Sequence, residues 1–222
     1  MKYVKIIILC LLMVSCSSVE LVDNWKNPDI DTYIPNKVLL IGMTSNYDAR
    51  KQFEKQLQEE FTSRGIESVM SLNLLKSSFT SEKKTKEELK SLESNLIDNG
   101  FDTILLTKVI GVEDKIEYKK NYYGYDSTYR KFKEDYLKYQ DVFYNPDYYE
   151  EYTIYHTETS MYCICSTKDR DLLWKGYIDI MDPQSIHETI NDYVQLILII
   201  LEEQQLITPK IFKEENTIEA IQ

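Results

Sequence analysis

The run Lys37-Val-Leu-Leu-Ile-Gly-Met-Thr44 is apolar at nearly every position between its two ends. Pro35 precedes it and a polar turn follows it. Because the apolar residues are continuous rather than alternating, the run predicts a strand that is buried on both faces. Such strands occur in sheets that carry helices on their faces, so the segments on either side of the run indicate the rest of the fold.

Helix and strand patterns alternate after this run. Ser45 or Asn46 caps a predicted helix that ends before Gly65, and a second amphipathic helix is expected over 85–99. Strands are expected over 66–75 and 101–109. The resulting βαβαβ order predicts parallel strands joined by right-handed crossovers.

The C-terminal third predicts a different arrangement. Residues 152–165 and 172–181 form a predicted β-hairpin, and the last helix, over 186–206, is apolar nearly all round and is expected to be the most buried helix. The predicted fold class is therefore α/β, with α+β as the alternative. We expect a two-layer or three-layer sandwich with a mixed sheet.

The N-terminus has the features of a secretory signal. Lys2 and Lys5 precede nine apolar residues, a run shorter than the ~20 residues that span a bilayer as a helix. The end of the segment, Leu12-Met-Val-Ser-Cys16, resembles the lipobox of bacterial lipoproteins, with Met13 in place of the usual leucine. The resemblance implies that residues 1–15 are removed and that Cys16 carries acyl chains such as palmitate. The alternative is an ordinary signal peptide in which the cysteine is incidental.

The same resemblance implies a location. Ser17 and Ser18, rather than an aspartate, follow Cys16, which implies sorting to the outer membrane with the body facing the periplasm. We expect a tether over 16–36, a single domain over 37–208 with a tyrosine-rich insertion at about 119–151, and a polar tail over 209–222.

The charge balance excludes one class of partner. The chain has a net charge of −11, and removal of residues 1–15 takes away Lys2 and Lys5 without any acidic residue. Nucleic-acid binding depends on neutralising phosphates with Lys and Arg, so it is not expected. Membrane attachment is expected through acylated Cys16, since peripheral binding to anionic lipid also needs basic clusters.

Tyrosine is concentrated in one part of the chain. Twelve of the 18 tyrosines fall between Tyr118 and Tyr155. Tyrosine is enriched at protein interfaces, so the insertion is the best candidate for a binding surface. The alternative is that these rings only attach the insertion to its own sheet. The candidate partner-binding residues are Tyr122, Tyr123, Tyr125, Tyr129, Tyr136, Tyr139, Tyr144, Tyr148 and Tyr149.

Other candidate sites have simpler structural explanations. His156 and Glu158 share a face of a strand and are interpreted as a hydrogen-bonded pair, because no third metal ligand is apparent. Cys163 and Cys165 are interpreted as buried free thiols. The segment 42–46 is interpreted as a strand-to-helix turn rather than an anion site. We therefore predict no catalytic residue, no metal and no cofactor.

Several short stretches together resemble a family of small, uncharacterised envelope lipoproteins of Gram-negative, Bacteroidetes-type bacteria. They are Trp25-x-x-Pro28, the run 37–44, Arg50-x-x-Phe53-Glu54-x-x-Leu57, Gly65 and Gly100-Phe-Asp102. The resemblance implies a location and a fold but no activity. The function expected is a non-enzymatic interaction or accessory module with an envelope protein as its partner. The alternative is a glycan- or peptidoglycan-binding module, and an envelope enzyme is the third hypothesis.

Overall fold

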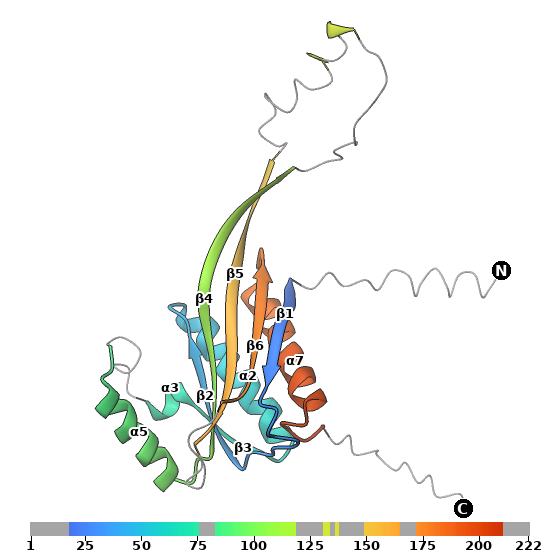
Figure 1. The fold of residues 1–222 in the computed structure, drawn as a ribbon. Helices are drawn as coiled ribbons and strands as arrows, with labels where there is room; N and C mark the ends of the chain where they lie inside the picture. Colours follow the sequence, from blue (N-terminus) through green and yellow to red (C-terminus); the bar gives the residue numbers. More distant parts are fainter. Residues whose placement is uncertain are drawn as a thin grey trace, which may run out of the picture.

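The computed structural model describes residues 18–75, 83–118, 131–133, 136–137, 149–164 and 172–210. These residues form a six-stranded mixed sheet in the order β1-β6-β5-β4-β2-β3, with helices packed against it (Figure 1). The predicted α/β fold with a mixed sheet is confirmed. The elements are β1 (Val19–Lys26), β2 (Lys37–Met43), α2 (Tyr47–Ser63), β3 (Glu67–Met70), α3 (Ser71–Leu74), α5 (Lys86–Asp98), β4 (Thr103–Tyr118), β5 (Tyr149–Cys163), β6 (Leu172–Met181) and α7 (Ile186–Glu203).

Strand β2 is the centre of the parallel half of the sheet. It lies between β3 and β4 and runs parallel to both, and its residues 38–42 are buried, as the apolar run predicts. Strand β3 ends at Met70, earlier than the predicted 66–75, because the chain turns into the short helix α3. The first residue of that helix, Ser71, is fully buried and hydrogen-bonded to Glu54 of α2, which fixes the turn.

Helices cover the two faces of the sheet unequally (Figure 1). Helices α2 and α7 pack on one face, where Phe61, Trp174 and Ile197 are completely buried. Helix α5 packs on the other face, through Leu96 against Leu39 of β2. The molecule therefore has three layers over β2 and two layers over the antiparallel half. Helix α7 buries more residues than α2 or α5, as its all-round apolar sequence predicts.

Local sequence signals set the helix ends. Asn46, Thr85 and Ser185 are the N-caps of α2, α5 and α7, and each side chain accepts a hydrogen bond from the backbone N–H three residues later. Gly65 and Gly100 follow α2 and α5 with φ of 78° and 81°. This left-handed conformation favours glycine and ends a helix, so the predicted ends are confirmed.

The prediction of a tether over 16–36 is wrong for residues 19–26. These residues form β1, an edge strand that pairs antiparallel with β6. Val19 is buried in the main core, and Leu21 packs against it. A register shift between Leu21 and Asp23 interrupts the alternation of side chains, which hides the strand pattern in the sequence.

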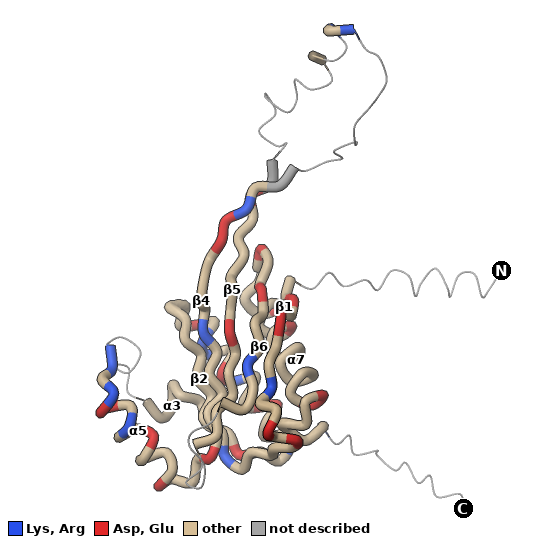
Figure 2. Tube along the Cα trace, viewed as in Figure 1, with Lys and Arg blue, Asp and Glu red and all other residues tan. Residues whose placement is uncertain are grey.

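Strands β4 and β5 extend beyond their neighbours as a two-stranded ribbon. Pairing of β4 with β2 ends at Lys108, and pairing of β5 with β6 ends at Ile154. We define the ribbon as residues 114–118 and 149–153, which form strand pairs only with each other among the described residues. It rises clear of the sheet (Figure 1), and residues of both charges lie along it (Figure 2).

The ribbon also changes the predicted strand bounds. The predicted strand over 101–109 continues to Tyr118, and the strand predicted from residue 152 already begins at Tyr149. Residues 149–151, assigned by the sequence to the insertion, therefore belong to β5. Among the helices in the described ranges, none has the length and apolar character needed to cross a membrane.

Candidate functional site

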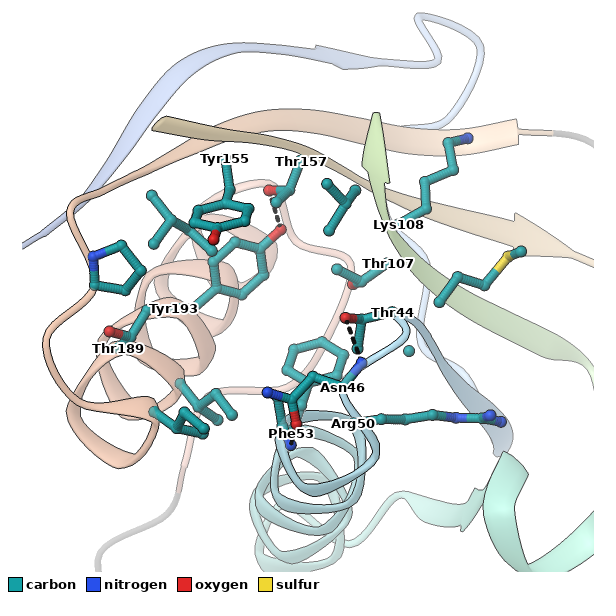
Figure 3. Close-up of a pocket in the computed structure, with 18 of the residues that line it drawn as sticks. Thr44, Asn46, Arg50, Phe53, Thr107, Lys108, Tyr155, Thr157, Thr189 and Tyr193 are labelled. Atoms are coloured by element: carbon teal, nitrogen blue, oxygen red, sulfur yellow. Dashed lines mark hydrogen bonds between the residues drawn. The ribbon is translucent and has the colours of Figure 1, made fainter. Parts of the chain in front are cut away.

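A cavity of about 530 Å³ opens where the carboxyl end of β2 meets the N-termini of α2 and α7 (Figure 3). Its walls come from β2, β4, β5, β6 and both helices, so distant parts of the sequence create it together. The volume lies within the ~300–1,000 Å³ that is usual for small-molecule sites. The lining is mostly apolar, with Met43, Ala49, Phe53, Val109, Ile180, Pro183, Ile186 and Ile190 among its residues.

A chain of hydroxyl groups runs through the cavity wall. Thr157 Oγ1 donates to the carbonyl of Ile178 at 2.6 Å, so the Tyr193 hydroxyl, 2.7 Å away, must donate to Thr157. Thr159 must then donate to Tyr193 at 3.0 Å, and Thr107 must donate to Thr159 at 2.8 Å. One backbone carbonyl therefore orients four side chains. Burial raises the pKa of Tyr193 to about 12, which keeps its phenol protonated.

Other polar side chains around the cavity are also engaged with the protein. Thr44 Oγ1 accepts the N–H of Asn46, and Asn46 Oδ1 accepts the N–H of Ala49 as the helix cap. Arg50 points away from the cavity (Figure 3) and donates to Glu54 at 2.9 Å and to Ser71 at 2.8 Å. These hydrogen bonds hold the walls of the cavity in place.

Glu54 accepts hydrogen bonds from two backbone N–H groups near the end of β2. Its Oε1 accepts the N–H of Gly42 at 3.0 Å and its Oε2 accepts the N–H of Leu72 at 3.0 Å. The side chain is completely buried. The segment 42–46 is therefore a strand-to-helix turn whose first N–H is satisfied by the protein, as the sequence indicates.

Two charged side chains, Arg50 and Lys108, line the cavity, and they are paired with Glu54 and Glu158 respectively. The lining residues of the cavity include no carboxylate, histidine or cysteine, and its reactive hydroxyls are committed to one another. Within the described ranges, no group of three or more His, Cys, Asp and Glu residues is arranged to hold a metal ion. The arrangement suits an apolar moiety, with Ser45, Tyr155 and Thr189 as lining residues that carry hydroxyls.

His156 and Glu158 share the open face of the sheet, but they are not bonded to each other. His156 Nδ1 lies 2.7 Å from Asp179 Oδ1, and Nε2 lies 3.6 Å from Glu113. The hydrogen bond with Asp179 is the main cause that raises the pKa of His156. Glu158 is instead paired with Lys108 at 2.8 Å, which lowers the pKa of Glu158 despite its partial burial. The prediction that His156 and Glu158 form a hydrogen-bonded pair with each other is therefore wrong, and each side chain has a different structural partner.

Cys163 corrects another expectation. It is 1% exposed, as expected for a core residue, but it is disulfide-bonded. The interpretation of Cys163 as a free thiol is therefore wrong. Cys165 lies outside the described residues. An oxidised cysteine is consistent with an oxidising compartment such as the periplasm.

Most of the sequence-predicted site residues lie outside the described part of the chain. They are Cys16, Tyr122, Tyr123, Tyr125, Tyr129, Tyr139, Tyr144 and Tyr148. Tyr136 is described and is 52% exposed, with its ring 6.0 Å from that of Phe132. Tyr149 begins β5 and pairs with Tyr118 across the ribbon. The ribbon therefore carries both ends of the tyrosine-rich segment.

The sequence prediction missed the cavity. The available signal was a set of hydroxyl-bearing residues in the predicted strands and the last helix: Thr107 in β4, Thr157 and Thr159 in β5, and Tyr193 in α7. The two threonines of β5 are two residues apart and so share a face. No local pattern shows that a tyrosine 34 residues later meets them.

Comparisons with known proteins give structural matches of low TM-score and low sequence identity. No family model matches the chain, and no curated protein matches it. The PelC dodecamer structure from Paraburkholderia phytofirmans has a TM-score of 0.41 and 9% identity, over 84% of this chain and 97% of that one. Lipoprotein GNA1162 from Neisseria meningitidis has a TM-score of 0.41 and 9% identity, over 76% of this chain and 99% of that one. At these values we transfer no function from either protein.

Proposed function

We propose that this chain is a lipid-anchored, non-enzymatic accessory protein of a Gram-negative cell envelope. In this proposal acylated Cys16 holds it at the outer membrane, with the body in the periplasm. The ribbon and the tyrosine-rich segment of 119–151 bind an envelope protein. The lipobox-like end of the N-terminal segment supports the anchor.

The observation that carries the binding role is the projecting ribbon. From residue 109 onward, β4 has β5 on one side and no second strand partner among the described residues, so backbone groups on its other side are free to pair. An unpaired strand edge is a place where a partner protein can add a strand.

The composition of the segment at the end of the ribbon supports the same role. Residues 119–148 contain eight tyrosines and two phenylalanines, and six basic against five acidic residues. The segment is therefore close to neutral in a chain whose net charge is −11. An aromatic-rich segment with a net charge near zero on an acidic protein is suited to contact rather than to keeping the protein soluble.

Two variants test the binding role. Replacing Tyr122, Tyr123, Tyr125 and Tyr129 together by Ser removes the rings, and replacing the same four by Phe keeps them. If the rings form a protein interface, crosslinking in cells captures a partner with wild type and the Phe variant but not with the Ser variant. Equal capture by all three proteins would reject the proposal.

The same variants separate the glycan alternative. Purified cell-wall sacculi should sediment the protein if the segment binds glycan. The Phe variant should then also fail, because tyrosine hydroxyls contribute hydrogen bonds to sugars. The anchor is tested independently with labelled fatty acid, which should mark wild type and not Cys16→Ser. Equal labelling of both would reject the lipid anchor.

The cavity supports a second candidate function, the binding of an apolar chain. Its hydroxyls are already hydrogen-bonded to one another, so a sugar would find few free partners there. All described helices and strands lie after Ser17, so the chain from Ser17 onward is a suitable test protein. It should bind cis-parinaric acid saturably, and Ala49→Phe, which fills the cavity, should abolish binding. Lys51→Phe adds the same ring at an exposed position of the same helix and should leave binding intact.

A further inference from the structure

We propose that one end of this molecule docks on the bilayer surface through apolar side chains around the cavity mouth. The inference rests on the proposed lipid anchor at Cys16. The docking end is the end at which β1 begins, β2 and β6 finish, and α2 and α7 start. The partner of this surface is a zwitterionic lipid surface.

The length of chain between the anchor and the sheet carries the argument. Met181 donates its N–H to the carbonyl of Ser18 at 2.7 Å, so Ser18 is held at the end of the sheet. Cys16 is two residues before it, and two extended residues reach no more than ~7 Å. A lipid on Cys16 therefore keeps this end of the sheet next to the headgroups. A free tether over 16–36 would have left the orientation open, but β1 already begins at Val19, three residues after Cys16.

Exposed apolar side chains gather at this same end. We define the apolar rim as Met43, Tyr47, Val109, Val112, Ile116 and Ile186, which are between 40% and 67% exposed. Met43, Val109 and Ile186 line the cavity directly. Val112 pairs with Tyr155, which also lines the cavity, and opposite residues of an antiparallel pair share a face. Ile116 is four residues further along β4 and so lies on that face as well.

The ribbon determines how the molecule is tilted. Glu113 of β4 pairs with Ile154 of β5, and Ile154 pairs with Met181, the last residue of β6. Residues 114–118 therefore extend beyond the end of the sheet. Five strand residues span ~17 Å, which exceeds the reach of the linker to Cys16. A ribbon standing along the bilayer normal would carry Asp114 into hydrocarbon, which is costly. The strands therefore lie inclined to the bilayer, with the cavity side of the ribbon against the headgroups.

The charges near the apolar rim indicate the type of lipid. Lys108 and Lys115, next to Val109 and Ile116, are paired with Glu158 and Glu113. The other charges are acidic: Asp48 follows Tyr47, Asp114 lies between Val112 and Ile116, and Glu188 is in the first turn of α7. Binding to anionic lipid needs clusters of Lys and Arg, and these residues have the opposite sign. Contact through this end is therefore apolar, and it weakens as the anionic fraction of the bilayer rises.

Tryptophan quenching tests the orientation directly. The lipidated protein is reconstituted into phosphatidylcholine vesicles that contain phospholipid with brominated acyl chains. Ile186→Trp places a reporter in the apolar rim, and Ile199→Trp places one at the other end of the same helix, ~20 Å away. Ile199 is 52% exposed, close to the 46% of Ile186, so the two positions are matched. The native Trp25 and Trp174 give the same background in both variants.

The expected result is loss of the added emission for Ile186→Trp and no loss for Ile199→Trp. The loss should decrease when phosphatidylglycerol replaces part of the phosphatidylcholine. Flotation of the vesicles reports the anchor separately. Protein that does not float overturns both the anchor and the orientation. Protein that floats, with equal quenching of both reporters or none of either, overturns the orientation alone and leaves the anchor standing. If the emission of Ile186→Trp is not quenched in vesicles of phosphatidylcholine alone, a lipid surface is excluded as the partner of the apolar rim.

Discussion

Glu54 is the most completely enclosed charge in the described structure that is paired with another charge. It has no exposed surface, and Arg50, its partner on the next turn of α2, is 6% exposed. Its two oxygens also join α2 to Gly42 and to Leu72, so one carboxylate connects a helix, a strand end and a short helix. A buried charge with these partners holds the cavity wall in position.

We predict that Glu54→Ala lowers the free energy of unfolding by about 3–5 kcal/mol, because it leaves the Arg50 charge buried without its carboxylate. Glu59→Ala is the matched control, since Glu59 forms an exposed pair with Lys55 at the same spacing on the same helix. That pair contributes only about 0.3–0.5 kcal/mol. Urea denaturation of the three proteins measures both effects. Equal losses for the two variants would contradict this reading of the buried pair.

His156 gives the open face of the sheet a pH dependence. Its pKa is raised above the ordinary histidine value, first by the hydrogen bond with Asp179 and then by Glu113. A raised pKa in the folded state means that protonated His156 favours folding. This contribution is complete below the unfolded pKa of ~6.5 and is lost as pH rises through the higher folded value.

We predict that Asp179→Asn moves the pKa of His156 down further than Glu113→Gln does, because the bond with Asp179 is the larger cause. NMR titration of the imidazole C–H signals measures both shifts. A larger shift for Glu113→Gln would show that the ring turns toward Glu113 in solution. As the sequence indicates, His156→Ala should alter stability without abolishing partner binding.

At the scale of elements, the packing of β6 leaves no room for a side chain at Gly176. The ring of Trp174 lies across Gly176, and a Cβ built on Gly176 would meet ring carbons of Trp174 at 2.5 and 2.6 Å. Trp174 has no exposed surface, so the ring has no free space to move into. Glycine is therefore required in the middle of this strand for close packing rather than for a turn.

We predict that Gly176→Ala destabilises the protein by about 1–3 kcal/mol through overpacking. Gly111→Ala is the control, because a Cβ at Gly111 would meet His156 at an ordinary contact distance of 3.5 Å. Thermal unfolding followed by near-ultraviolet circular dichroism reports both stability and the environment of Trp174. An unchanged melting temperature in Gly176→Ala would mean that the ring can leave its place at little cost.

The elements that the sequence predicts well are those with a local physical signal. Strand β2 is apolar throughout because helices cover both its faces, and the last helix has its cap and its stripe within its own residues. Strand β1 has no such signal. It is an edge strand with a register shift, and its partner β6 lies at the far end of the sequence. The cavity was missed for the same reason, since no continuous segment contains it.

At the scale of the whole molecule, the described core closes without the tyrosine-rich segment. The main apolar cluster extends from Val19 to Ile207 and contains no residue between 106 and 160. The ribbon ends are held together by backbone pairing up to Tyr118 and Tyr149. The segment between them is therefore expected to serve binding rather than folding.

We predict that replacing residues 121–147 with a short Gly/Ser linker keeps a cooperative thermal transition and removes partner capture in a crosslinking assay. The reason is that each strand of the sheet retains its partner and each covering helix its apolar face. Loss of the cooperative transition would show that the tyrosines stabilise the sheet, which is the alternative interpretation of their concentration.

The pairing of the first strand with the last has a consequence for how the protein is made. Lys26 at the end of β1 donates to the carbonyl of Gln204, 178 positions later in the chain. The chain is synthesised from its N-terminus, so β1 has no partner until β6 and α7 have followed. Pairings this distant in sequence slow folding. An acylated N-terminus would therefore be fixed in the membrane while the rest of the domain is still unfolded, and a chain truncated before residue 172 could not complete its sheet.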